Sequence, residues 1–140
     1  MTRGLCVVGA LLLTIVVGGC APTISPSDHV TIAFHYSHFE PSTVRVPVGV
    51  PIAITLRNDD PIGHEWIVGG PEVHAVHRTG TEAVHEGRPD EVTVPAYATR
   101  TTTITFDRPG TYAFTCHLPG HEAYGMKGML TVVGYELTGG

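Results

Sequence analysis

Positive charge is scarce in this sequence. Lys127 is the only lysine, and the eight Lys and Arg residues are outnumbered by 13 Asp and Glu residues, which gives a formal net charge of −5 at pH 7. Binding to nucleic acid needs a basic face that neutralises phosphates. The composition therefore excludes nucleic acid from the partners that we expect.

Long helical patterns are missing as well, because no segment combines a sustained 3.6-residue apolar period with helix caps. Instead, 17 Gly and 11 Pro residues divide the chain into short apolar and β-branched runs. About seven to eight such runs predict an all-β fold, either a β-sandwich or a small Greek-key barrel. The predicted strands are Val30–Tyr36, Thr43–Val46, Pro51–Leu56, Glu65–Val68, Glu91–Val94, Thr101–Phe106, Thr111–Thr115 and Gly128–Val133.

One segment is too long for an ordinary turn. Gly69–Asp90 contains 22 residues, among them His74, His77 and His85. A loop of this length in a compact domain is usually functional or mobile. We expect a short helix around Val73–Thr79 within it.

An apolar run long enough to span a membrane is also missing. Arg3 precedes the apolar stretch Gly4–Val17, which is shorter than the ~20 residues that a spanning helix needs. The next residues, Val17-Gly18-Gly19-Cys20, resemble a bacterial lipobox, with an ordinary signal peptide or a short membrane helix as the alternative. We therefore predict lipoprotein processing that acylates Cys20.

This processing implies a simple organisation of the chain. The predicted segments are a lipoprotein signal peptide over 1–19, a lipid-anchored tether over 20–29, one domain over 30–134 and a C-terminal tail over 135–140. The protein then lies outside the cytoplasm, attached by its lipid to the bacterial cell membrane or to the periplasmic face of a membrane.

Cysteine is too rare for a disulfide framework. Of the three cysteines, Cys6 and Cys20 belong to the N-terminal segment, so Cys116 is the single thiol of the predicted domain. A lone thiol in an oxidising compartment is at risk unless it is buried or held by a metal. Nine histidines point to the second possibility, because histidine is the commonest metal ligand.

Three candidate ligands follow one another at regular spacing near the C-terminus. Cys116 directly follows a predicted strand, His121 comes after four more residues, and Met126 after a further four. A thiolate and two imidazoles with a weak axial thioether form the blue-copper electron-transfer set. The set needs a second histidine, and His64 is the best candidate because it lies at the edge of a strand after a turn-rich segment.

Two separate segments resemble known copper proteins. The stretch Cys116–Gly128, with its Cys-x-x-Pro-Gly-His start and Met-Lys-Gly exit, resembles the ligand loop of azurin and of bacterial plastocyanin-like proteins, and Gly63-His64-x-Trp66 also resembles azurin. Over residues 30–133 the chain thus resembles a single-domain cupredoxin of the plastocyanin and azurin family. The resemblance implies a Greek-key β-sandwich with one type 1 copper ion near one end.

The same resemblance assigns the copper ligands. It implies His64, Cys116 and His121 as the main ligands, Met126 as the axial ligand, and the Gly63 carbonyl as a weak axial contact. Glu65 stands where azurin and plastocyanin usually have an asparagine, and the methionine loop is one residue longer than in azurin. The Glu65 carboxylate can still accept hydrogen bonds from loop amides. His117 is interpreted as a non-ligand, because strand alternation directs it to the other face.

A site closed by four protein ligands has no position for a substrate, and no hydrolase or phosphate-loop motif competes with it, so we expect no enzymatic activity. The expected function is the carriage of single electrons between extracytoplasmic redox partners. These partners would dock transiently near His121, where Leu118, Pro119 and Tyr124 can form an apolar surface on a monomer.

The alternative function is that of a copper carrier or copper-resistance lipoprotein, in which His74, His77 and His85 of the long loop collect copper. A metal-free sandwich requires the ligand match to be accidental.

Overall fold

The computed structural model describes residues 27–82 and 84–134. The predicted signal peptide, Cys20 and the tail over 135–140 lie outside this range. No helix among the described residues is long and apolar enough to cross a membrane. The first strand begins at His29, the last residue of the predicted tether.

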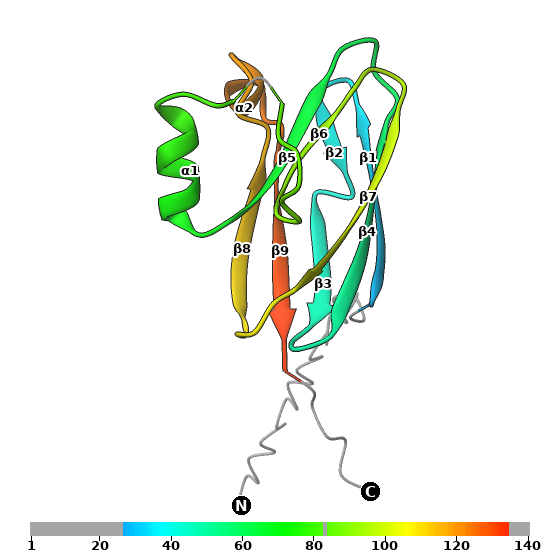
Figure 1. Cartoon of the computed structure of the whole chain (residues 1–140), viewed down its shortest axis with the longest axis vertical. Coiled ribbons are helices and arrows are strands. Elements are labelled where there is room, and N and C mark those ends of the chain that lie inside the picture. Colours follow the sequence, from blue (N-terminus) through cyan, green and yellow to red (C-terminus); the bar gives the residue numbers. More distant parts are fainter. Residues whose placement is uncertain (1–26, 83, 135–140) are drawn as a thin grey trace, which may run out of the picture.

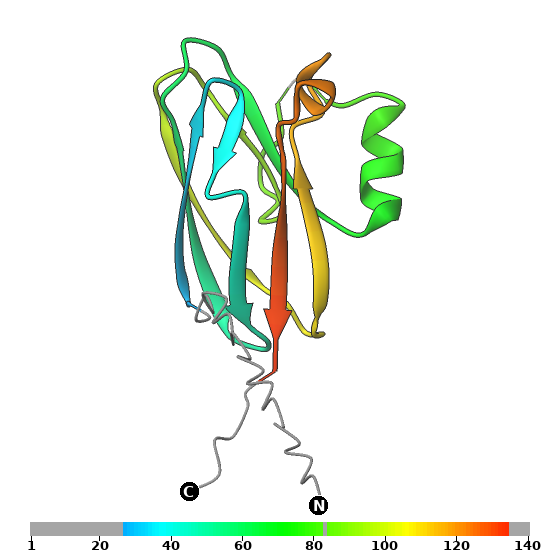
Figure 2. The same ribbon diagram turned by 180° about the vertical axis from the view of Figure 1, so that it is seen from behind.

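The described chain forms two sheets that face each other, as Figures 1 and 2 show from opposite sides. The first sheet has the order β2-β1-β4-β7, with β1 (His29–His35), β2 (His38–Glu40), β4 (Pro51–Asn58) and β7 (Thr99–Thr105). The second has the order β3-β9-β8-β5-β6, with β3 (Thr43–Pro47), β5 (His64–Gly69), β6 (Glu91–Val94), β8 (Gly110–Thr115) and β9 (Lys127–Val133). The predicted all-β sandwich is confirmed.

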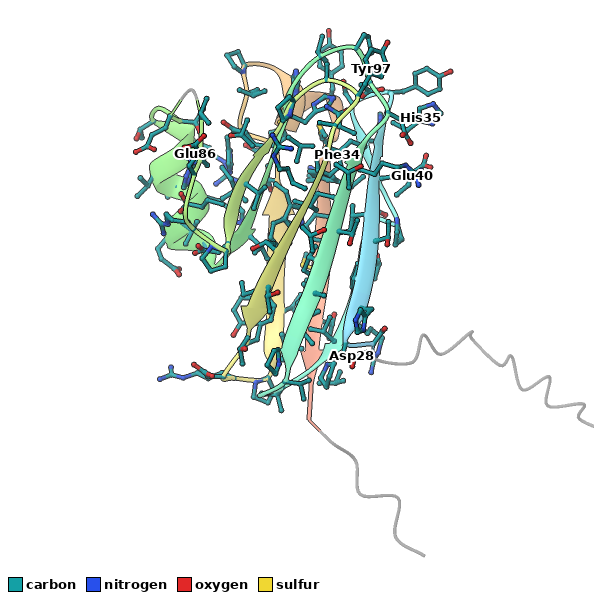
Figure 3. All side chains as sticks on the ribbon, turned by 45° about the vertical axis from the view of Figure 1, so that its right-hand side comes forward. Asp28, Phe34, His35, Glu40, Glu86 and Tyr97 are labelled. Atoms are coloured by element: carbon teal, nitrogen blue, oxygen red, sulfur yellow. The ribbon has the colours of Figure 1, made fainter. Side chains whose placement is uncertain are left out.

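The core lies between the sheets and follows from the alternation of apolar residues along the strands. In β4 every second residue is fully buried: Ile52, Ile54 and Leu56 are 0% exposed. Phe34 points into the interior from the first sheet (Figure 3), and Trp66 enters it from the second. This packing fixes the register of both sheets, because a slip of one residue would turn the apolar side chains outward.

Strand β2 is absent from the predicted set. It forms a hairpin with β1 through Tyr36 and Ser37, whose φ angles are 52° and 56°. Such positive φ angles are normally signalled by Gly, Asn or Asp, and none of these stands here. The turn is stabilised from a distance instead, because the backbone N–H groups of both residues donate to the carboxylate of Asp60.

Two short helices interrupt the strands. Helix α1 (Pro71–Arg78) lies inside the long histidine-containing segment and confirms the helix expected there. It begins two residues earlier than predicted because Pro71 suits the first turn, where its missing N–H has no intrahelical partner. The single-turn helix α2 (His121–Tyr124) connects β8 to β9 at one end of the sandwich (Figure 1).

A glycine of β9 is required by close packing. A Cβ at Gly128 would collide with the Phe114 ring and would lie 2.6 Å from the backbone oxygen of Ser42. Because Phe114 belongs to β8 and the Ser42 carbonyl accepts the Met129 N–H of β9, we expect Gly128→Ala to lower the free energy of unfolding by about 1–3 kcal/mol. Gly134→Ala is the control, since nothing lies within 4 Å of a Cβ there. Urea unfolding of both variants measures the difference, and equal stabilities would contradict this packing.

Candidate metal centre

Adjacent strand ends bring the predicted ligands together. His64 opens β5, Cys116 directly follows β8, His121 opens α2, and Met126 directly precedes β9. Strands β5 and β8 are antiparallel neighbours, and so are β8 and β9. The start of β5, the end of β8 and the start of β9 therefore lie at the same end of the second sheet, beside α2 (Figure 1).

Three donor atoms converge at this end. His121 Nδ1 lies 3.2 Å from His64 Nδ1 and 3.2 Å from Cys116 Sγ, and the three donors all lie within 4.8 Å of one another. Ligands bound at about 2.0–2.3 Å from one ion stand about 3.3–3.8 Å apart. Two imidazoles and a thiol are borderline and soft ligands that suit copper. The residues present therefore fit a copper ion.

A buried carboxylate orients His64. The His64 Nε2–H donates to Asp60 Oδ2 over 2.8 Å, and both side chains are almost inaccessible. The proton therefore belongs to Nε2, and the lone pair of Nδ1 faces His121 and Cys116. A carboxylate that fixes the tautomer of a histidine is the usual outer partner of a metal ligand. The sequence reasoning missed Asp60, although its i,i+4 spacing to His64 was visible.

The surroundings of Cys116 are apolar, with two backbone donors. The N–H of Glu65 points at Cys116 Sγ over 3.4 Å, and the Cys116 side chain is fully buried. Burial raises the pKa of the Cys116 thiol to about 11, although backbone hydrogen bonds from Glu65 and Leu118 oppose this shift. The free protein therefore holds a protonated thiol at neutral pH, and a metal must displace that proton.

This proton predicts how metal affinity depends on pH. Burial lowers the pKa values of His64 and His121, so both imidazoles are neutral above pH 7. Only the Cys116 proton is then released on binding, and we expect the apparent Cu(II) affinity to rise about tenfold per pH unit between pH 7 and 9. Chelator competition at a series of pH values measures this slope. An affinity that does not change with pH would contradict a protonated thiol.

Met126 is attached to both loop ligands through its backbone. Cys116 N–H donates to the Met126 carbonyl over 3.1 Å, and Met126 N–H donates to the His121 carbonyl over 3.0 Å. The Met126 side chain is 0% exposed, whereas Met129 on β9 is 42% exposed. The loop can turn there because Gly120 and Gly125 adopt φ angles of 87° and 98°, which favour glycine.

Glu65 and Gly63 flank the candidate ligand His64. The Glu65 carboxylate accepts the backbone N–H of His117 over 3.3 Å, which confirms that it can accept a hydrogen bond from the ligand loop. It also accepts the hydroxyl of Thr81 over 3.1 Å, a contact that the sequence did not reveal. A Cβ at Gly63 would meet only the Val94 carbonyl, at 3.8 Å, so no protein atom requires a glycine there.

The remaining histidines of this region lie elsewhere. His74 Nδ1 and His117 Nε2 are 3.0 Å apart, and His117 Nδ1 lies 3.5 Å from Glu122 Oε2. The His117 ring is therefore directed toward α1 and α2 rather than toward Cys116. Burial lowers the pKa of His117 to about 4, so this ring is neutral at pH 7. His77 and His85 belong to a separate group with Glu91.

A two-sheet β-sandwich with two histidines and a cysteine at one end defines the cupredoxin class of copper proteins. The cupredoxin-like domain family matches residues 7–132, and the chain belongs to this family.

Two relatives of this chain are a copper-resistant cuproprotein and an auracyanin. The chain is 29% identical over 97 residues to the copper-resistant cuproprotein CopI of Rubrivivax gelatinosus, a match covering 67% of this chain and 59% of the relative. It is 30% identical over 109 residues to auracyanin-B of Chloroflexus aurantiacus, covering 67% of this chain and 46% of the relative. The chain thus spans about half the length of these two curated relatives.

A solved structure shows the same fold over nearly its whole length. Na-dithionite reduced auracyanin from the photosynthetic bacterium Roseiflexus castenholzii superposes with a TM-score of 0.67 at 27% sequence identity. The match covers 78% of this chain and 99% of that chain. The sequence match to the family and the structural match to a solved protein therefore give the same fold class.

Proposed function

We propose that the chain is a type 1 (blue) copper protein that carries single electrons between redox partners. The convergence of His64, Cys116 and His121 beside the buried Met126 is the observation that supports this proposal. These residues would hold the ion, which supplies a one-electron Cu(II)/Cu(I) couple when bound. The R. castenholzii relative is described in a dithionite-reduced form, which is consistent with a reducible centre in the family.

The protein around the ligands supports electron transfer rather than catalysis on a substrate. Asp60 holds the His64 ring, Glu65 N–H holds the Cys116 sulfur, and Met126 is hydrogen-bonded on both sides. His64 and Cys116 are fully buried, which keeps water from their donor atoms. A site fixed in this way changes little between two oxidation states and leaves no open position for a substrate, so we propose that the chain is not an enzyme.

The end of the sandwich that carries the ligands has exposed apolar side chains. Tyr124 in α2 is 78% exposed, Ile62 before β5 is 47% exposed, and Tyr97 is 72% exposed and lies at this end (Figure 3). The His121 ring is only partly covered. We propose that redox proteins dock transiently on this surface, against a monomer of this chain. We also propose, from the sequence, that Cys20 anchors the protein to a membrane outside the cytoplasm.

A copper carrier is the second candidate function. It is favoured by the relative from R. gelatinosus, which is named a copper-resistant cuproprotein. The two functions differ in how the protein holds the ion. An electron carrier binds copper tightly, turns blue with Cu(II) and cycles reversibly in voltammetry, whereas a copper carrier exchanges colourless Cu(I) with a competing chelator. Absorbance and voltammetry after addition of Cu(II) therefore test the proposal.

The axial position gives a finer test of the electron carrier. We expect Met126→Leu to keep the blue band and to raise the reduction potential, because a weak thioether donor is removed and not replaced. Met126→Gln is expected to lower the potential through a harder oxygen donor. Met129→Leu is the matched control, since this change nearly conserves volume and Met129 lies partly exposed on β9. A large shift for Met129→Leu with none for Met126→Leu would overturn the assignment.

A further inference from the structure

A second group of metal-binding side chains lies beyond the centre described above. His77 near the end of α1, His85 in the loop that follows and Glu91 at the start of β6 each place one donor atom within 4.8 Å of the others. The side chains of His77, His85 and Glu91 are only 10%, 2% and 5% exposed. Polar groups buried to this extent need partners.

The spacing of these donors fits one tetrahedral ion. Glu91 Oε2 lies 3.2 Å from His85 Nδ1 and 3.6 Å from His77 Nε2. Ligands at about 2.0–2.2 Å from a tetrahedral metal stand about 3.3–3.6 Å apart. The three atoms are therefore already close to the positions that such an ion requires.

Hydrogen bonds on the outer side of each ring select the tautomer that turns an unprotonated nitrogen toward Glu91 in the neutral imidazole. His77 Nδ1 lies 2.8 Å from the Val73 carbonyl, which can only accept, so the proton is on Nδ1 and the lone pair on Nε2. The Thr81 hydroxyl donates to Glu65, so its oxygen accepts from His85 Nε2 at 3.0 Å. In the neutral His85 imidazole, Nδ1 then also carries a lone pair. Outer hydrogen bonds of this kind orient the histidines of metal sites.

The charges around the group call for a cation. Two lone pairs face one carboxylate oxygen of Glu91, and a second carboxylate, that of Glu65, is 0% exposed and lies 3.4 Å from His85. Arg88 binds the other oxygen of Glu91 over 2.9 Å, but its own side chain is 60% exposed. A cation placed among these carboxylate oxygens and imidazole nitrogens would offset the cost of burying the negative charges.

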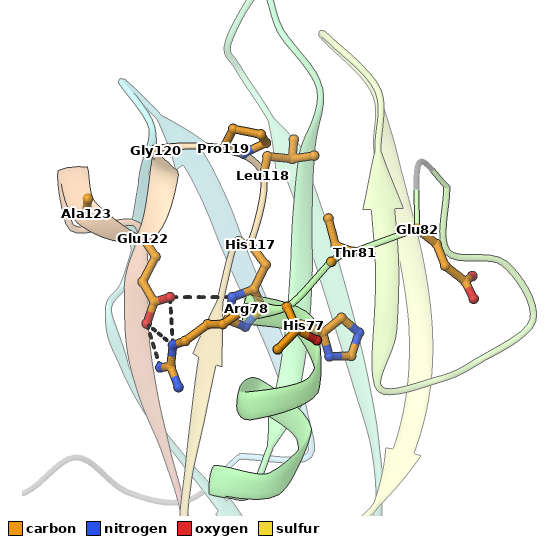
Figure 4. A pocket seen from close by; sticks show the side chains of 12 residues that line it. His77, Arg78, Thr81, Glu82, His117, Leu118, Pro119, Gly120, Glu122 and Ala123 are labelled. Atoms are coloured by element: carbon orange, nitrogen blue, oxygen red, sulfur yellow. Dashed lines mark hydrogen bonds and ion pairs between the residues drawn. The ribbon is translucent and has the colours of Figure 1, made fainter.

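The group also has an entry path. His77 and Thr81 line a surface groove of about 790 Å³ that continues along His117, Leu118 and Glu122. Figure 4 draws His77 and Thr81 among the side chains that line this groove. An ion and a water ligand can therefore reach His77 from solvent.

We propose that His77, His85 and Glu91 form a second metal site, which binds Zn(II) or Cu(II) through two imidazoles and one carboxylate. Imidazole and carboxylate without thiolate suit these divalent ions rather than Cu(I). The site is separate from the Cys116 centre and does not depend on what Cys116 binds. The alternative to a metal ion is a proton on His85, whose imidazolium would then form buried ion pairs with Glu65 and Glu91.

Zinc titration of the full-length chain tests the proposal. The protein is first given one equivalent of Cu(II), and Zn(II) is then titrated against a chromophoric chelator while the visible spectrum is followed. We expect the unaltered chain to bind one zinc ion. His85→Gln and Glu91→Gln should each weaken zinc binding by at least about 100-fold, because the loss of an outer partner alone costs about 10–100-fold. Thr81→Val, which removes the hydroxyl that His85 and Glu65 share but no proposed ligand, is expected to fall in that 10–100-fold range.

His74→Gln is the matched control. His74 lies on the same helix and is 3% exposed, but its ring is bonded to the Ala113 carbonyl and to His117. It should bind zinc like the unaltered chain. His77→Gln, at the least buried ligand, keeps the test valid if His85→Gln does not fold. Addition of a second equivalent of Cu(II) should give an additional EPR signal without the narrow hyperfine splitting of blue copper. This signal should be lost in His85→Gln and Glu91→Gln. Zinc and copper binding unaffected by His85→Gln and Glu91→Gln, or absent altogether, overturns the proposal.

Discussion

Cys116→Ser is expected to abolish the intense visible absorption and the narrow copper hyperfine splitting of the copper-loaded protein. Both signals arise from a bond between sulfur and Cu(II), and Cys116 is the one cysteine among the described residues. Serine is nearly isosteric, and its hydroxyl can accept the Glu65 N–H that now points at the sulfur. The sandwich should therefore remain folded, while Cu(II) affinity falls by at least about 100-fold because a ligand is lost.

Absorbance, EPR and circular dichroism of the variant measure these three effects. Cys20→Ser is the matched control, because it removes a different cysteine from the same chain and should leave the copper spectrum unchanged. A Cys116→Ser protein that stays blue would show that the site is misassigned. An unaltered chain that binds Cu(II) without turning blue would contradict the type 1 centre itself.

The sequence was sufficient to predict most strands because local chemistry determines them. Runs such as Thr101–Phe106 combine β-branched residues with turn signals at their ends, and β7 forms there. Strand β2 could not be predicted in the same way. Its turn at Tyr36 and Ser37 depends on the carboxylate of Asp60, and a contact across more than 20 residues of chain has no local signature.

The candidate site shows the same division. Cys116, His121 and Met126 stand close together in the sequence, so their spacing alone suggested a common centre. The groups that orient them are contributed by other segments: Asp60 to His64, and the Glu65 N–H to the sulfur. In the copper-carrier alternative the three loop histidines collect copper together, but His74 is bonded to His117, whereas His77 and His85 face Glu91. That partner lies on a strand and was visible only in the fold.

Glu65 connects the two groups of candidate ligands. Its backbone N–H contacts Cys116, its carboxylate accepts from His117 and Thr81, and His85 lies 3.4 Å away. An asparagine, as in azurin and plastocyanin, has no charge to offer His85. In this chain, one Glu65 carboxylate oxygen accepts from His117, and the other accepts from Thr81 and faces His85.

Asp60→Asn is expected to weaken both the fold and the metal centre. The Asp60 carboxylate accepts three hydrogen bonds, from the N–H groups of Tyr36 and Ser37 and from His64 Nε2, at 2.7–2.8 Å. An asparagine side chain must direct its NH₂ group either at the Tyr36 N–H, in place of Oδ1, or at the Ser37 N–H and His64 Nε2, in place of Oδ2. Loss of one partner in a buried charged network costs about 3–5 kcal/mol, and we expect the free energy of unfolding to fall by roughly this amount at pH 7.

The metal centre should respond through the tautomer of His64. If the amide NH₂ faces His64 Nε2, the imidazole proton moves to Nδ1, the nitrogen that faces Cys116 and His121. We therefore expect Cu(II) affinity to fall about 10–100-fold, as for the loss of other outer partners. Competition titrations measure this change, and an unaltered affinity would show that Asp60 does not fix the tautomer.

Asp59→Asn is the matched control, and pH separates the two aspartates further. Asp59 forms an exposed ion pair with Arg57, whose loss should cost no more than about 1 kcal/mol.

At Asp60, burial acts to raise the pKa, but the N–H groups of Ser37 and Tyr36 and the hydrogen bond to His64 outweigh it and lower the pKa. A lowered pKa means that the ionised carboxylate stabilises the fold above its unfolded pKa of about 3.9 and that this contribution is lost as the pH falls further. The stability difference between the unaltered chain and Asp60→Asn should therefore narrow below about pH 4, and a difference that stays constant down to pH 2 would show that the charge of Asp60 is not its cause.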